Sequence, residues 1–129
     1  MGGVIIVAAA VGLGLLASRC AGEVNEAKAV VGQFMAAGQA HDIDGAYALC
    51  APQVERSEAE TLIQDNYGSL FQNYKGLRTS SWHIESSGGT TMASLNGSVL
   101  YTDGSTLPYE AELVKTGGKW KIYYIYIGY

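Results

Sequence analysis

The chain has 129 residues, a formal net charge of −4 and 48% apolar residues. This length supports one domain with a single hydrophobic core. Its eight lysines and arginines are scattered and form no basic stripe, which excludes nucleic acid as an expected partner. Two histidines and two separated cysteines do not supply the clustered ligands of a metal site, so we expect no metal and no cofactor.

The first feature along the chain is an uncharged apolar run from Val4 to Ala17. A cleaved signal peptide, a lipoprotein signal ending at Cys20 and an uncleaved transmembrane helix are the three interpretations. No basic residue precedes the run, which argues against a signal peptide, and Arg19 stands where a lipoprotein signal has a small residue. With its flanking residues the run spans roughly 25 Å as a helix. We therefore predict a single-pass transmembrane anchor over residues 1–19 and a junction over residues 20–23.

Small residues recur along this predicted anchor. Ala8 and Gly12 are four positions apart, and so are Ala10 and Gly14. Such spacing lets a second transmembrane helix approach closely, so the expected partners are integral membrane protein subunits and the lipid bilayer. The alternative interpretation is that small residues merely fill a short apolar helix.

Three helices are expected after the junction. Residues at helical spacing give the first helix one apolar stripe: Val24, Ala27, Val31, Phe34, Met35 and Gly38. Asp42 or Asp44 is a good N-cap for a short second helix, which Pro52 ends. Ser57 and Glu60 form a capping box that opens a third helix.

From Leu77 onward the apolar period changes from 3.6 residues to 2, which predicts strands. Glycine-containing pairs at positions 88–89, 103–104 and 117–118 mark three tight turns between them. Four antiparallel strands follow. The expected fold class is therefore α+β, with an N-terminal transmembrane helix and then three helices packed on a four-stranded antiparallel sheet.

The last predicted strand is apolar on both faces beyond Lys121. A strand of this kind is buried on both faces, so one face belongs to the core and the other needs a cover. Tyrosine is favoured at protein interfaces. We predict that the second face meets a protein partner through Tyr123, Ile125, Ile127 and Tyr129. A small-molecule pocket, and a β-rich core that uses aromatic residues for strand propensity, are the alternatives.

Two stretches, VVGQFMAAGQAHDIDGAYALCAP and GSVLYTDGSTLPYEAELVKTGGKWKIYYI, resemble the nuclear-transport-factor-2-like superfamily, in particular its small membrane-anchored members of unassigned function. The resemblance covers about residues 24 to 127 and implies a cone-shaped α+β domain with a curved sheet, here residues 24–129. It also implies a domain on the extracytoplasmic, periplasmic side, whereas Arg19 after the helix favours the cytoplasmic side. We adopt the extracytoplasmic side.

The family includes isomerases, dehydratases, binding domains and subunits of assemblies, so function has to come from the residues. His41, Asp42 and Asp44 are material for acid–base catalysis, yet a solvated loop and a helix cap explain them better. No nucleophile motif or phosphate-binding loop is present. We predict a non-enzymatic accessory or structural subunit of a larger membrane protein complex.

The alternative is a small-ligand-binding or enzymatic cone domain of isomerase or dehydratase type. Its pocket would contain His83, Tyr101 and Tyr109. An enclosed pocket with a perturbed titratable group favours this alternative, whereas a filled cone with an exposed apolar patch favours the accessory subunit.

Overall fold

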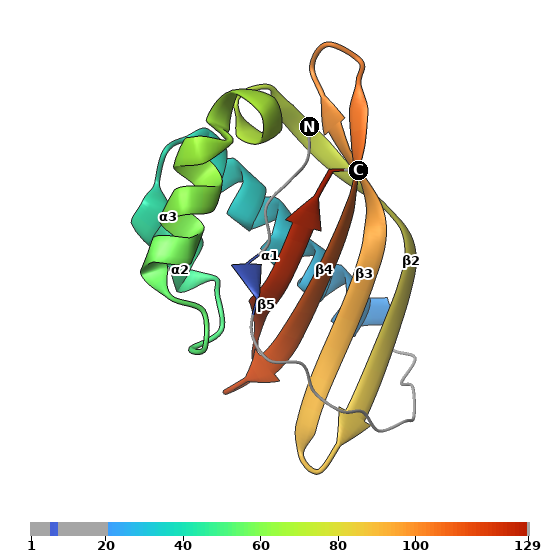
Figure 1. The fold of residues 1–129 in the computed structure, drawn as a ribbon. Helices are drawn as coiled ribbons and strands as arrows, with labels where there is room; N and C mark the ends of the chain where they lie inside the picture. The colour runs from blue at the N-terminus through green and yellow to red at the C-terminus, as the bar shows by residue number, and fades with distance from the viewer. Residues whose placement is uncertain (1–5, 8–20, 129) are drawn as a thin grey trace.

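The computed structural model describes residues 6–7 and 21–128 (Figure 1). A layer of helices covers one face of an antiparallel sheet, as the α+β prediction expects. The elements in chain order are β1 (Ile6–Val7), α1 (Ala21–Gln39), α2 (Ile43–Ala48), α3 (Arg56–Asp65), the π-helical turn η1 (Tyr67–Phe71), β2 (Tyr74–Ser87), β3 (Thr90–Tyr101), β4 (Thr106–Thr116) and β5 (Lys119–Ile127).

The helical layer forms because each helix has an apolar side. Figure 1 shows α1 running diagonally behind the sheet, with α2 and α3 beside it near β5. The predicted stripe of α1 is confirmed, since its members are at most 4% exposed: Val24, Ala27, Val31, Phe34 and Met35. Burial of this stripe, more than helix propensity, holds α1 in place.

Hydrogen bonds between residues close in the sequence cap the N-termini of α2 and α3. The Asp42 carboxylate accepts a bond from the Gly45 N–H at 2.9 Å, which confirms the predicted cap of α2. The predicted capping box at Ser57 and Glu60 is wrong, because α3 begins two residues earlier. Its Glu58 carboxylate accepts a bond from the Glu55 N–H at 3.0 Å.

The sheet has the strand order β1-β5-β4-β3-β2. All three predicted turns are present, and Gly88, Gly104 and Gly117 each adopt a positive φ there. Between Thr79 and Ser81 the pairing of β2 with β3 shifts register. Such a bulge bends and twists the strand that carries it.

The bulge in β2 lies over Gly97 of β3. A Cβ atom added at Gly97 would overlap the Arg78 carbonyl oxygen and come within 2.8 Å of Thr79 Cα. These are backbone atoms, which cannot give way as a side chain would. Glycine at this position therefore permits the close approach of the two strands.

A second register shift, between Glu112 and Leu113, decides which side chains of β5 enter the core. Glu112 pairs with Tyr124 but Leu113 pairs with Ile122, which leaves Tyr123 as the extra residue. The shift lets Ile122 and Ile125 both face the helices, although an unbroken strand would place them on opposite faces. The expectation of two regularly alternating faces in this strand is corrected accordingly.

The loop between α2 and α3 is joined to β5 by main-chain hydrogen bonds. Ala51 N–H donates to the Ile122 carbonyl at 2.7 Å, and Ile122 N–H donates to the Leu49 carbonyl at 2.8 Å. Cys50 thereby forms a parallel bridge with Ile122. This bridge fixes the helical layer to the last strand.

The predicted transmembrane helix over residues 1–19 is wrong. Ile6 and Val7 are extended, and they pair with Ile125 and Tyr124 of β5 as a fifth, two-residue strand. Two consecutive β-branched residues favour a strand, and the outer edge of β5 has main-chain groups that need partners. Within residues 6–7 and 21–128, no helix is long and apolar enough to cross a membrane.

Several residues assigned to the predicted anchor lie outside the described residues. These are the predicted helix-packing positions and the cysteine considered for lipidation: Ala8, Ala10, Gly12, Gly14 and Cys20. Of the predicted junction, Ala21 onward belongs to α1.

We expect Gly97→Ala to lower the free energy of unfolding by about 3 kcal/mol, at the upper end of the cost of overpacking, because the new methyl group meets the backbone at Arg78. Gly76→Ala on β2 is the matched control, since nothing lies within 4 Å of its Cβ position. We expect a change within about 0.5 kcal/mol for it. Urea unfolding measures both. Equal effects of the two exchanges would contradict the close approach.

Candidate functional site

The space between the helices and the sheet is filled by apolar side chains. Among the described residues, none that is polar or charged is buried. The largest fully buried side chains come from both layers: Tyr109, Phe34, Phe71, Met35, Leu62, Ile63, Leu70, Ile84, Leu95, Leu113 and Ile122. These side chains form one continuous hydrophobic core between the helices and the sheet.

The two tyrosines of the predicted pocket belong to this filled interior. Tyr101 donates a hydrogen bond to the Leu70 carbonyl at 2.9 Å, and the hydroxyl groups of Tyr109 and Thr79 are 2.8 Å apart. Burial raises the pKa of Tyr101 to about 12, and it also raises the pKa of Tyr109. Both phenols are therefore neutral and satisfied, which is the state of core residues.

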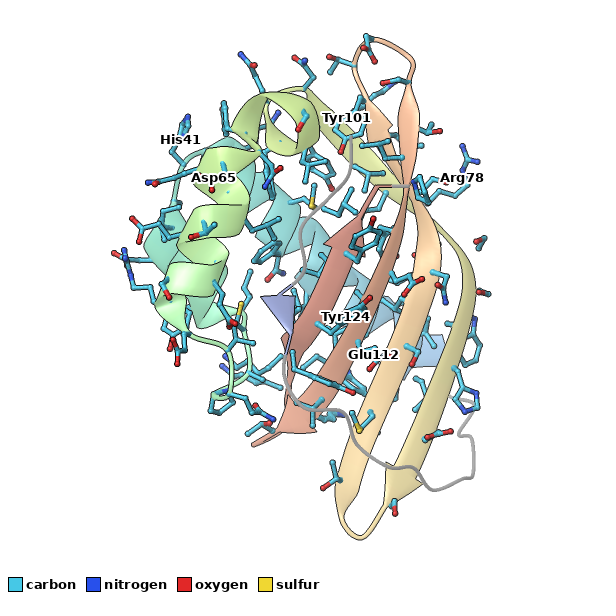
Figure 2. All side chains as sticks on the ribbon, in the orientation of Figure 1. His41, Asp65, Arg78, Tyr101, Glu112 and Tyr124 are labelled. Carbon is cyan, nitrogen blue, oxygen red and sulfur yellow. The ribbon has the colours of Figure 1, made fainter. Side chains whose placement is uncertain are left out.

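His83, the third residue of the predicted pocket, lies on the other face of the sheet. It is opposite Ser94, and Ser94 is opposite Glu112 of β4. Figure 2 shows Glu112 on the face turned away from α1. The side chain of His83 is 57% exposed and its Nε2 is 2.7 Å from Glu85. The structure therefore does not bring His83 together with Tyr101 and Tyr109.

The predicted partner interface on β5 is mostly core. Ile125 and Ile127 are fully buried and Tyr123 is 4% exposed. Ile125 and Ile127 stand opposite Ala111 and Tyr109, which are core residues of β4. Tyr129 lies outside the described residues. A partner cannot reach the two isoleucines while the domain is folded.

Tyrosines and carboxylates meet where β4 runs beside β5, an arrangement that sequence reasoning missed. Tyr123 donates to the Glu112 carboxylate at 2.7 Å, and Tyr124 donates to Glu110 at 3.4 Å. Burial, followed by the bond to Glu112, raises the pKa of Tyr123. Alternate glutamates opposite a tyrosine-rich strand are the sequence signal that could have found these pairs.

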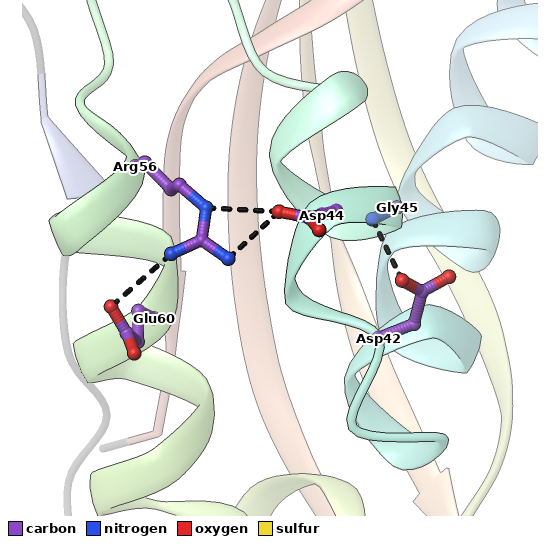
Figure 3. A network of polar contacts seen from close by, with 5 residues as sticks. All are labelled: Asp42, Asp44, Gly45, Arg56 and Glu60. Atoms are coloured by element: carbon purple, nitrogen blue, oxygen red, sulfur yellow. Dashed lines mark hydrogen bonds and ion pairs between the residues drawn. The ribbon is translucent and has the colours of Figure 1, made fainter.

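The acidic and histidine residues after α1 have structural roles. His41, in the turn after α1, has a positive φ of 60°, and its ring stacks on Tyr67 with the centroids 3.9 Å apart. Figure 3 shows the neighbouring network, in which Arg56 bridges Asp44 of α2 and Glu60 of α3. These pairs are exposed and contribute little to stability. They align α2 with α3, and no buried acid–base pair results.

Cys50 is the described cysteine, and it is poorly suited to be a nucleophile. It is 7% exposed and its thiol donates weakly to the Ala46 carbonyl at 3.6 Å. Burial raises its pKa to about 12, so the reactive thiolate is scarce at neutral pH. In the described part of the chain, no group of three or more His, Cys, Asp or Glu residues could hold a metal ion.

The free edge of β2 is the most prominent surface feature. Within the described residues β2 pairs only with β3, and it is the outermost strand of the sheet. Trp82 on this strand is 46% exposed. Among the described residues, it is the one large hydrophobic side chain that is exposed to solvent. An open strand edge offers main-chain donors and acceptors to another chain.

A shallow cleft of about 340 Å³ opens between η1 and the β3–β4 turn. Its polar groups are largely committed within the protein. Asp103 accepts bonds from the main-chain N–H and the hydroxyl of Ser105, at 2.9 and 2.6 Å, and these bonds lower its pKa. The Tyr101 hydroxyl, also in the wall, donates to Leu70. We therefore interpret this cleft as part of the surface of the β3–β4 turn.

A scan of the sequence against protein-family models found no match, and a search of curated proteins found none either. The resemblance to the nuclear-transport-factor-2-like superfamily therefore stays a prediction. A partner in the membrane and the extracytoplasmic side also stay predictions, because no described contact bears on them.

We expect Tyr101→Phe to lower the free energy of unfolding at neutral pH by about 1–2 kcal/mol, since it removes the buried hydrogen bond from the Tyr101 hydroxyl to the Leu70 carbonyl. The raised pKa also makes stability depend on alkaline pH. The folded chain holds the Tyr101 proton more tightly than the unfolded chain, so stability falls as pH rises from about 10 towards about 12. The variant should show a shallower fall in this range.

Urea unfolding at a series of pH values measures both effects. Tyr47→Phe on α2 is the control, because no bond of its hydroxyl group is found among the described residues. An unchanged alkaline slope in Tyr101→Phe would show that Tyr101 does not titrate as described.

Proposed function

We propose that this chain is a non-enzymatic accessory subunit of a larger protein assembly and that it binds its partner along the open edge of β2. The observation that carries the proposal is that the exposed Trp82 lies on a strand whose outer edge has no pairing strand among residues 6–7 and 21–128. The state of the buried ionisable groups supports a non-enzymatic role, since the Tyr101 and Tyr123 hydroxyl groups are hydrogen-bonded within the protein and burial keeps the Cys50 thiol protonated.

The expected partner contributes an extended segment that adds a strand beside β2. Main-chain hydrogen bonds then supply affinity, and pockets for alternate side chains supply specificity. Trp82 stands opposite Leu95 in the register and so lies on the helix-facing side of the sheet. An apolar side chain of the added strand packs against its indole ring, and tryptophan is the residue type most enriched at such binding hot spots.

We expect Trp82→Ser to weaken the complex by more than about tenfold, as loss of a hot-spot tryptophan does. Trp82→Phe is the matched control and should retain most of the binding, because it keeps an aromatic surface. Neither exchange should unfold the domain, since Trp82 is 46% exposed. The measurement is gentle extraction of the full-length chain from its own cells, size analysis, and mass spectrometry of co-migrating proteins.

The outcomes separate the two parts of the proposal. A stoichiometric partner that is lost in Trp82→Ser and kept in Trp82→Phe supports both the role and the edge. A partner that both variants retain contradicts the β2 edge as the binding site. Recovery of the unaltered chain as a monodisperse monomer contradicts the accessory role itself.

A further inference from the structure

A second cleft, of about 390 Å³, lies near the start of β5, far from the edge of the sheet that β2 forms. It is bordered by α1, by the end of α2 at Leu49, and by the β4–β5 turn with the start of β5. Its size is within the range of small-molecule sites, about 300–1,000 Å³. Neither the tyrosine–carboxylate pairs nor the open β2 edge includes any of its wall residues.

Trp120 in the wall of this cleft has an unsatisfied polar group. The residue is 3% exposed, and its Nε1–H is buried without a hydrogen-bond acceptor among the described residues. Leaving such a donor unpaired is unfavourable, because its hydrogen bond to water is lost on burial and not replaced. By contrast, the buried hydroxyl groups of Tyr101 and Tyr123 both have acceptors. The unpaired indole therefore needs an explanation that packing alone does not provide.

Lys115, itself bound to Glu23, helps to hold the indole ring of Trp120 in place. The Lys115 ammonium lies 5.6 Å from the centroid of the Trp120 ring. Lys115 also donates to both carboxylate oxygens of Glu23, at 2.9 and 3.0 Å, and so joins the first turn of α1 to β4. A donor fixed in this way is preorganised for an acceptor, because binding need not order the ring.

The charges of the cleft favour a single negative charge on the ligand. Lys119 and Lys121 are in one wall, and Glu26 of α1 is in another. Two ammonium groups and one carboxylate leave a net charge of +1. Lys121 is held at the cleft because its Nζ donates to the Ala48 carbonyl at 2.7 Å. Lys119 is exposed and is the cation that can turn towards a ligand.

The remaining wall residues are suited to an apolar body. Val30 of α1 and Leu49 at the end of α2 are partly buried and contribute apolar surface. Together with the cations, they match a molecule that has a carboxylate at one end and a short hydrocarbon part at the other. Glu26 opposes a second negative charge, which disfavours dianions such as phosphate monoesters.

We propose that this cleft binds a small monocarboxylate. Its carboxylate accepts hydrogen bonds from Trp120 Nε1 and from Lys119, and its hydrocarbon part lies against Val30 and Leu49. Because Nε1 is buried, the carboxylate reaches it only when a neighbouring side chain of the wall shifts. Charge-assisted bonds to a carboxylate are about twice as strong as neutral ones, so the ligand satisfies the indole better than a neutral acceptor does.

The test uses the full-length chain with Trp82→Phe, which leaves Trp120 as the sole tryptophan. Sodium hexanoate is added and the Trp120 fluorescence is followed, with hexanol and hexylamine as probes of equal chain length. We expect a saturable change with hexanoate, half complete near or below about 1 mM, and at least tenfold weaker effects of the two other probes. No saturable change with hexanoate, or an equal response to hexanol, overturns the proposal.

Two variants locate the site. In the same background, Lys119→Gln should weaken hexanoate binding at least tenfold, whereas the matched control Lys75→Gln on β2 should leave it unchanged. Calorimetric titration of Trp120→Phe, which keeps an aromatic ring and removes the donor, should show a similar loss. Should that variant fail to fold, Lys119→Gln decides alone, and unaltered binding to it overturns the assignment. None of these results depends on a protein partner at β2.

Discussion

The register shift at Tyr123 is the constraint on which the rest of the domain depends. Regular alternation along β5 would divide its isoleucines between the two faces of the sheet. The one extra residue allows Ile122, Ile125 and Ile127 to be buried together, opposite Leu113, Ala111 and Tyr109. Because all three isoleucines are inside, the space under the helices is filled. The two clefts and the β2 edge described above lie at the edges and ends of the sheet.

Most features that a local rule decides could be predicted from the sequence, the exception being the capping box of α3, which lies at Glu55 and Glu58 rather than at Ser57 and Glu60. The apolar stripe of α1, the Asp42 cap and the three glycine turns were all predictable, because each depends on residues a few positions apart. The bulges were not predictable, since a period-2 pattern assumes that no residue is inserted. The helix predicted at Ile6 and Val7 was wrong for another reason. An uncharged β-branched pair suits an apolar helix and a strand equally well, and only the open edge of β5 decides between them.

The candidate sites show the same limit. Tyr101, Tyr109 and His83 were grouped from their strand positions, but the pleat places His83 on the opposite face from the two tyrosines. The cleft at Trp120 combines residues from α1, the end of α2 and the β4–β5 turn, so no short sequence motif predicts it. One clue was present, namely a tryptophan between two lysines at the start of a strand. A buried indole needs an acceptor, and neighbouring lysines cannot provide one.

The bridge between the α2–α3 loop and Ile122 has a consequence for how the chain is synthesised. The helices are made first, yet the two hydrogen bonds that fix their loop to the sheet need β5, which emerges from the ribosome about seventy residues later, several seconds at ordinary translation rates. During that interval the helices lack the buried side chains of β5, among them Ile122 and Ile125. We infer that the nascent chain is most vulnerable to aggregation before β5 appears, and that its helices acquire their native arrangement late.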